Sequence, residues 1–145
     1  MNLQKDLSEF VELLSALNVR FLIVGAFAVA HHGYPRYTAD IDLFIETSSE
    51  NAERILNAIE QFGFGNVGLR KEDFLIENQV IQLGVAPNRI DILTSLTGVT
   101  FEEAWASRQS GEIGTLKVPF ISRDMLKRNK LACGRPQDLA DLERL

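Results

Sequence analysis

The chain has 145 residues, a length that suits one domain with a hydrophobic core of its own. Hydrophobic residues make up 46% and charged residues 24%, ordinary values that exclude collagen, coiled coil and disorder. Fifteen Lys and Arg against twenty Asp and Glu give a net charge of −5, which argues against a general nucleic-acid coat protein.

The first half of the chain predicts alternating helices and strands. Apolar residues recur at helical spacing in some segments and form short β-rich runs in others. Thr47 and Glu50 form a capping box that would start a helix, and Gly63 would end it. The expected elements are a helix over residues 3–18, a strand over 20–24, a helix over 26–32, a strand over 40–46 and a helix over 47–62.

The second half predicts more strands, followed by helices. Ser122 can cap a helix, Gly134 can end it, and Pro136 suits the first position of the next helix. The expected elements are strands over 74–76, 80–86 and 89–93, a helix over 101–108, a strand over 116–121, and helices over 122–131 and from 136 onward. We expect the strands around Pro87 and Asn88 to form a hairpin. This order predicts one mixed α/β (α+β) domain over residues 1–145, with a core of about 1–121 and C-terminal helices over about 122–145.

Membrane and secretion signals are weak. The longest apolar run, Phe21–Ala30, is about half of what a bilayer crossing needs. The N-terminal segment is typical of an amphipathic helix rather than a signal peptide. A single cysteine, Cys133, excludes a disulfide framework and a Cys-based zinc site. We therefore expect a cytoplasmic protein with no membrane partner.

Three aspartates stand in strand-like segments. Asp40 and Asp42 lie two residues apart, so they share one face of the predicted strand and lie roughly 7 Å apart along it. Asp91 lies between aliphatic residues of another predicted strand. A solvated strand face explains Asp-x-Asp alone, but Asp is a poor strand former and like charges on one face repel. If the two strands are neighbours, the three carboxylates converge as in a two-metal phosphoryl-transfer site.

Two other features fit a site for phosphates. Gly25 lies between a predicted strand and a predicted helix, fifteen residues before Asp40, where a backbone can approach an anion. Residues 117–135 carry six Lys and Arg against one acid, a net charge of +5, which leaves −10 on the rest of the chain. Within this basic segment Lys130 and Arg135 are the favoured phosphate-binding candidates, and the whole patch could receive an RNA end.

These residues together resemble the signature of the nucleotidyltransferase superfamily related to DNA polymerase beta. The matching segments are Val24-Gly25-Ala26, Thr38 to Leu43 with its two aspartates, and Ile90-Asp91-Ile92. The C-terminal run from Ser122 to Leu142 is similar to the tail of small bacterial nucleotidyltransferases of the abortive-infection toxin type. The resemblance implies a nucleotidyltransferase fold, a small mixed sheet flanked by helices with a short helical tail.

The resemblance also implies a role for each matching residue. Asp40, Asp42 and Asp91 would be the catalytic, metal-binding residues, and the metal would be Mg²⁺ or Mn²⁺. The implied nucleotide-binding residues are Gly25, Ala26, Arg36, Thr38, Lys130 and Asp138, with Asp138 orienting Lys130 or touching the nucleotide. Ala26 departs from the usual Ser or Gly: it keeps the small size and the backbone N–H but has no hydroxyl.

The leading hypothesis is therefore a Mg²⁺-dependent nucleotidyltransferase that moves a nucleoside monophosphate from an NTP to a hydroxyl. The toxin-like tail favours an RNA acceptor, for example the end of a tRNA, or a protein acceptor over an antibiotic. Two alternatives stay open. The first is a non-catalytic binding module on the same fold, such as an antitoxin or a partner-binding component. The second is a phosphohydrolase that uses the same carboxylates.

Overall fold

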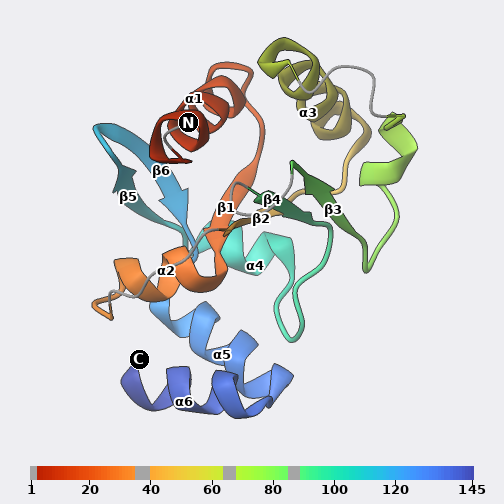
Figure 1. Ribbon diagram of the computed structural model, residues 1–145. Coiled ribbons are helices and arrows are strands. Elements are labelled where there is room, and N and C mark those ends of the chain that lie inside the picture. The colour runs from red at the N-terminus through yellow and green to blue at the C-terminus, as the bar shows by residue number, and fades with distance from the viewer. Residues whose placement is uncertain (1–2, 35–39, 64–67, 85–88) are drawn as a thin grey trace.

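The computed structural model describes residues 3–34, 40–63, 68–84 and 89–145 (Figure 1). The helices of the first half are α1 (Leu3–Ala16), α2 (Gly25–His31) and α3 (Ser49–Phe62), followed by the 3₁₀ helix η1 (Lys71–Phe74). The helices of the second half are α4 (Phe101–Ala106), α5 (Arg123–Cys133) and α6 (Pro136–Arg144). The strands are β1 (Phe21–Val24), β2 (Asp40–Ile45), β3 (Val80–Leu83), β4 (Arg89–Leu93), β5 (Gln109–Ile113) and β6 (Leu116–Phe120).

The strands form one mixed sheet in the order β3-β4-β2-β1-β6-β5. The pairs β1–β6 and β2–β4 are parallel, and the pairs β1–β2, β3–β4 and β5–β6 are antiparallel. The predicted mixed α/β class is confirmed. Strands β3 and β4 pair as the expected hairpin would require, while the connecting residues 85–88 lie outside the described part of the chain.

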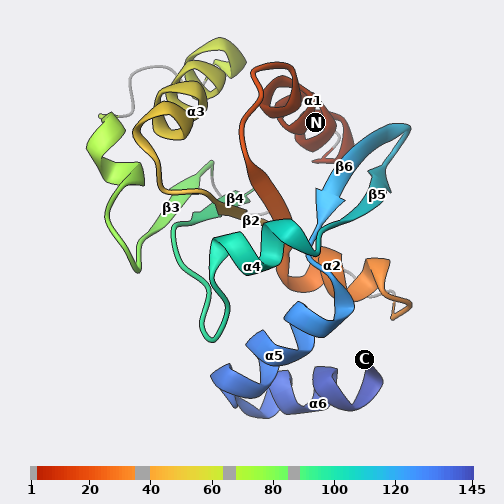
Figure 2. The ribbon, with the colours of Figure 1, turned by 180° about the vertical axis from the view of Figure 1, so that it is seen from behind.

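Helices cover the sheet at two ends of the molecule. Helices α1 and α3 lie together at one end, and α5 and α6 lie together at the opposite end (Figures 1 and 2). The rings of Phe10 on α1 and Phe62 on α3 meet edge to face with centroids 5.3 Å apart. All four residues of β1 are buried, so this strand runs through the core. None of the helices in the described ranges is long and apolar enough to cross a membrane.

Several predicted element ends agree with the structure because local chemistry sets them. Ser122 accepts a hydrogen bond from the backbone N–H of Met125 at the start of α5. Gly63 and Gly134 end α3 and α5 in the left-handed conformation. The start of α3 differs by one residue from the prediction, since Ser48 rather than Thr47 is its N-cap.

Two predictions for the middle of the chain are wrong. The expected strand over residues 74–76 does not form, and Phe74 is instead the last residue of η1, fully buried against the core. Strand β5 was not expected, because a segment with Gln, Ser, Gly and Glu has low β-propensity. This edge strand forms through pairing with β6, and Gly111 permits it: a Cβ there would lie 2.5 Å from the ring of Phe120.

Candidate active site

The three aspartates of the sequence motif lie on two neighbouring strands. Strands β2 and β4 are parallel, and in their register Asp42 is the partner of Asp91 and Asp40 is the partner of Arg89. Paired residues of adjacent strands project to the same face of a sheet, so these four side chains share one face. The three carboxylates were expected to converge only if their two strands are neighbours, and β2 and β4 are neighbours in the fold.

Burial and mutual repulsion set the charge state of the carboxylates. The side chain of Asp91 is 10% exposed and that of Asp40 is 35% exposed. Burial raises the pKa of Asp42 to about 6, and the charges of Asp91 and Asp40 and a hydrogen bond with Asp91 act in the same direction. The nearby guanidinium of Arg89 opposes these effects. The cluster thus holds more negative charge than its protein surroundings neutralise.

Arg89 lies among these carboxylates. Its Nη2 donates to Asp40 Oδ2 at 3.0 Å and to Asp91 Oδ2 at 3.2 Å. Its Nε lies 3.0 Å from Asp91 Oδ1, but neither atom has a hydrogen bond of acceptable geometry. The residue was visible in the sequence, two positions before Asp91 on the same polar strand face, but it was not assigned to the site.

The backbone of Gly25 lies directly beside the side chain of Asp42. Strand β1 pairs with β2 so that Val24 is the partner of Asp42, and Gly25 follows directly at the start of α2. A Cβ at Gly25 would lie 2.1 Å from Asp42 Oδ2, and the residue has φ +67°. Only glycine suits this conformation and this contact. Val24, the N-cap of α2, offers no side-chain hydrogen bond to the first turn of that helix.

These groups line a cleft of about 930 Å³ between the sheet and the C-terminal helices. Asn129 of α5 anchors the far wall, since its Nδ2 donates to the carbonyl of Thr97 at 3.0 Å. The lining also includes Ser95, Leu96 and Cys133, which the sequence analysis did not place in a site. Ser95 and Leu96 carry no recognisable local signal, because they reach the cleft only through the path of the loop after β4.

The C-terminal wall contains a second group of paired charges. Lys130 Nζ lies 3.4 Å from Asp138 Oδ1 and 3.1 Å from Asp141 Oδ2, and the Lys130 side chain is only 9% exposed. Arg135 Nε donates to Asp138 Oδ2 at 2.6 Å. This hydrogen bond, together with the charges of Lys130 and Arg135, holds the pKa of Asp138 below its usual value although burial acts against it. The ammonium of Lys130 is thus engaged with carboxylates.

Most of the predicted site residues meet in this cleft. Seven of them line it, namely Gly25, Ala26, Asp40, Asp42, Asp91, Lys130 and Asp138. Arg36 and Thr38 lie outside the described residues. Arg135, favoured as a phosphate contact, also lines the cleft with its side chain 74% exposed. The roles of all these residues in binding a nucleotide stay predictions.

The carboxylates suit a hard divalent cation by donor chemistry. All three offer oxygen ligands, which Mg²⁺ prefers, and the buried Asp91 Oδ1 has no hydrogen-bond partner. Within the described ranges, no three His, Cys, Asp or Glu side chains are gathered closely enough to hold a metal ion. The donors therefore fit Mg²⁺, while their present arrangement has Arg89 between Asp40 and Asp91.

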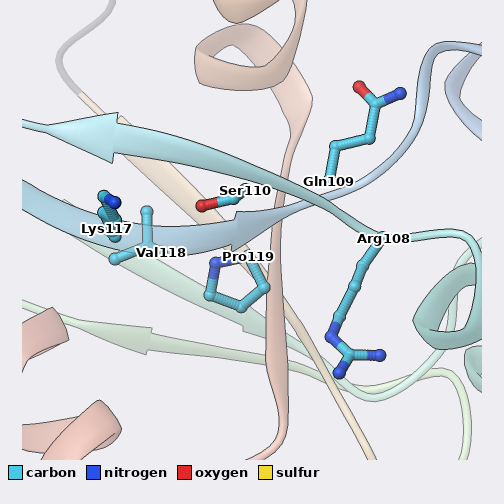
Figure 3. Close-up of a pocket in the computed structure, with 6 residues that line it drawn as sticks. All are labelled: Arg108, Gln109, Ser110, Lys117, Val118 and Pro119. Atoms are coloured by element: carbon cyan, nitrogen blue, oxygen red, sulfur yellow. The ribbon is translucent and has the colours of Figure 1, made fainter.

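A separate hollow of about 430 Å³ lies on the β5–β6 hairpin. Figure 3 shows Arg108 and Lys117 at its two ends, with Ser110 between them. The guanidinium of Arg108 lies over the ring of Trp105, 4.0 Å from the ring centroid. The lining has no carboxylate, so this hollow does not offer the ligands of a divalent-metal site.

Comparisons with known proteins identify the family and the fold of the chain. The sequence profile of the aminoglycoside-2''-adenylyltransferase family matches residues 6–145. A solved structure from Thermotoga maritima, described as a "putative nucleotidyltransferase", superposes with a TM-score of 0.64 at 18% identity, covering 97% of this chain and 89% of that one. No curated protein matches the sequence significantly. The likeness to the solved structure establishes the fold, and the family match spans nearly the whole sequence: the chain belongs to the aminoglycoside-2''-adenylyltransferase family and is a minimal nucleotidyltransferase.

Proposed function

We propose that the protein transfers a nucleoside monophosphate from an NTP to an acceptor hydroxyl in a Mg²⁺-dependent reaction. The observation that carries this proposal is the alignment of Asp40, Asp42 and Asp91 on two adjacent parallel strands that line the cleft. Gly25 adds to it, since its missing side chain keeps the backbone close to Asp42.

In the proposed reaction the acceptor oxygen bonds to the α-phosphorus, and the bond to the pyrophosphate leaving group breaks. Bound Mg²⁺ supplies neutralisation of the triphosphate charge and a lowered pKa of the attacking hydroxyl. Asp40 and Asp42 provide its carboxylate ligands. Asp91 provides a further ligand and accepts the proton of the hydroxyl. No covalent intermediate with the protein is needed.

Lys130 and Arg135 are the proposed cations on the opposite wall. An ammonium has three donors, and the two carboxylate partners of Lys130 leave one for a phosphate oxygen. Asp138 then orients Lys130, as the family resemblance implies. Arg36 and Thr38, which precede the paired aspartates in sequence, remain proposed phosphate or ribose contacts.

The pairing of the cations in the basic segment, residues 117–135, bears on which class of acceptor the protein uses. Three of its six cations pair with carboxylates of the described residues: Arg128 with Glu103, and Lys130 and Arg135 with Asp138. This pairing reduces the positive charge that the segment offers to an RNA backbone. The overall charge of −5 and the family profile favour a small cationic acceptor such as an aminoglycoside.

RNA or protein acceptors form the second candidate. They rest on the resemblance of residues 122–142 to toxin-type tails, as does a cognate antitoxin or toxin partner. One labelling assay distinguishes a small-molecule acceptor from a macromolecular acceptor.

The test is incubation of the protein with each α-labelled NTP, Mg²⁺ and, in separate reactions, an aminoglycoside mixture, total RNA or a protein extract. Asp42→Asn should abolish labelling, because it removes a metal ligand, while circular dichroism shows an unchanged fold. Asp124→Asn, the same chemical change on the exposed first turn of α5, is the matched control and should label like the wild type.

Each outcome decides between the candidates. Label on the aminoglycoside supports the small acceptor, and label on RNA or protein supports the second candidate. NTP turnover without any acceptor would indicate the phosphohydrolase. Wild-type labelling by Asp42→Asn would contradict the assignment of the carboxylates. Absence of label and of NTP turnover in every reaction, together with absent binding of all four NTPs by isothermal titration calorimetry, would indicate a non-catalytic module.

A further inference from the structure

Arg89 lies in a position that the proposed reaction does not explain. Its guanidinium contacts Asp40 and Asp91, two of the three carboxylates offered to the metal. The side chain is 33% exposed and lines the cleft, so it is neither buried in the core nor held away from the ligand site. The register of β2 and β4 puts Arg89 beside Asp40 directly.

The guanidinium is a suitable stand-in for a divalent cation. It keeps its charge throughout the physiological pH range and presents several donors in one plane, so it can bridge two carboxylates. The three carboxylates would repel one another strongly with no positive charge between them. Arg89 hydrogen-bonds to both Asp40 and Asp91 and so places a positive charge between them.

The contact between Arg89 and Asp91 is only partly hydrogen-bonded, and this favours displacement of Arg89 by a divalent cation. Arg89 Nε and Asp91 Oδ1 are 3.0 Å apart, yet both are buried atoms without a hydrogen bond of good geometry. Buried polar atoms left in this state raise the free energy of the conformation. A divalent ion that binds Asp91 Oδ1 directly would satisfy the oxygen better than Arg89 does.

We propose that Arg89 is an internal counter-ion that occupies the carboxylate cluster in the metal-free protein and competes with the divalent cation for Asp40 and Asp91. This proposal rests on the proposed function in one respect, because it takes these carboxylates as the metal ligands. Cation binding must break at least one of the two Arg89 contacts. Arg89 therefore lowers the metal affinity of the free protein while stabilising its fold.

The test measures metal binding without any nucleotide or turnover. Mn²⁺ and Mg²⁺ are titrated into the wild type, Arg89→Met and Arg20→Met by isothermal titration calorimetry. Arg89→Met should bind the cation about tenfold more tightly, because a charge-assisted competitor has been removed. Arg20→Met is the matched control: it also removes one arginine, from an exposed pair with Glu46 after the end of β2, and its affinity should stay within about twofold of the wild type.

Thermal unfolding in EDTA gives a second readout. Arg89→Met should unfold at a lower temperature than the wild type, and saturating Mg²⁺ should remove most of this difference. If Arg89→Met does not fold, Arg89→Lys keeps the charge but cannot bridge both carboxylates in one plane, so it should bind the cation more tightly than the wild type by a smaller factor.

Equal or weaker cation binding by Arg89→Met, or by Arg89→Lys where only that variant folds, would overturn the proposal. The labelling of acceptors by the wild type would be unaffected by that result, so the proposed function would survive it. Conversely, absent labelling combined with tighter cation binding by Arg89→Met would support the counter-ion and reject the transferase reaction.

Discussion

Two groups of acidic residues lie around the same cleft, and their charges are balanced differently. On β2 and β4, Arg89 contacts Asp40 and Asp91 and lies near Asp42. On α5 and α6, two aspartates meet two cations, Lys130 and Arg135. We name the first group the strand cluster and the second the helix cluster.

The pKa directions follow this difference in balance. In the strand cluster, burial and the other carboxylates raise the pKa of Asp42 to about 6. In the helix cluster, the hydrogen bond from Arg135 lowers the pKa of Asp138. An aspartate with excess negative charge around it can gain from a bound cation, whereas a neutralised one mainly holds its own helices together. The strand cluster is thus suited to binding a cation, whereas the helix cluster joins α5 to α6 and holds Lys130 in place for the proposed phosphate contact.

The largest effect on stability is expected from a substitution that removes a cation from the helix cluster. Lys130→Met leaves Asp138 and Asp141 with less counter-charge in a buried position, so the free energy of unfolding should fall by about 3–5 kcal/mol. Urea denaturation followed by circular dichroism measures this loss. The Mn²⁺ affinity of the folded variant should stay close to that of the wild type, because the carboxylates that Lys130 contacts, Asp138 and Asp141, lie on α6 and outside the strand cluster.

Arg20→Met serves as the control for this prediction. It removes a cation from a pair in which the arginine side chain is 52% exposed, so the loss should be about 1 kcal/mol or less. If Lys130→Met lost no more stability than Arg20→Met, the helix cluster would not have the structural role assigned to it.

A smaller effect on stability is expected from a substitution of Gly25, whose backbone lies beside the strand cluster. Gly25→Ala places a Cβ against Asp42 at φ +67°, so the free energy of unfolding should fall by about 2–3 kcal/mol and cation affinity should drop. Gly33→Ala is the matched control: Gly33 has φ +111°, but no atom of the described residues lies within 4 Å of an added Cβ. It should retain the wild-type cation affinity, and equal affinity losses in both variants would reject a specific contact between Gly25 and Asp42.

The strand cluster was predictable because its signals are local. Alternation along a strand places Asp40 and Asp42 on one face, and a glycine between a strand and a helix marks a close approach. The ends of α3, α5 and α6 follow from capping residues in the same way. Each of these features depends on residues only a few positions apart.

The helix cluster and the sheet edge depended on distant partners. The family resemblance implied that Asp138 orients Lys130, and the contacts of Lys130 with Asp138 and Asp141 form only when α5 and α6 pack against each other. The phosphate contact of Lys130 stays a prediction. Strand β5 forms because β6 lies beside it, not because its own residues favour a strand. The position of Arg89 between two carboxylates likewise requires the β2–β4 register, which the sequence does not specify.

The smallest expected effect has the opposite sign and separates the two clusters. Asp42→Asn removes a carboxylate that is held in an unfavourable environment, so in EDTA at pH 7.5 the free energy of unfolding should rise by about 1–3 kcal/mol. Loss of the charge of Asp42 thus stabilises the protein, whereas loss of the charge of Lys130 destabilises it. Mg²⁺ at one hundred times the dissociation constant should offset this difference, because it stabilises the wild type and not the variant by about 2.7 kcal/mol.

The pH dependence of that difference follows from the direction of the shift. The pKa of Asp42 is higher in the folded state, about 6, than its ordinary value of 3.8, so the folded protein binds more protons between these values. The stability of the wild type relative to Asp42→Asn must therefore fall as pH rises from about 4 to about 6, and level off above that range. Urea denaturation of both proteins in EDTA at several pH values measures this curve. A constant difference between pH 4.5 and pH 7.5 would show that the strand cluster carries no excess negative charge, and the contrast with the helix cluster would then be lost.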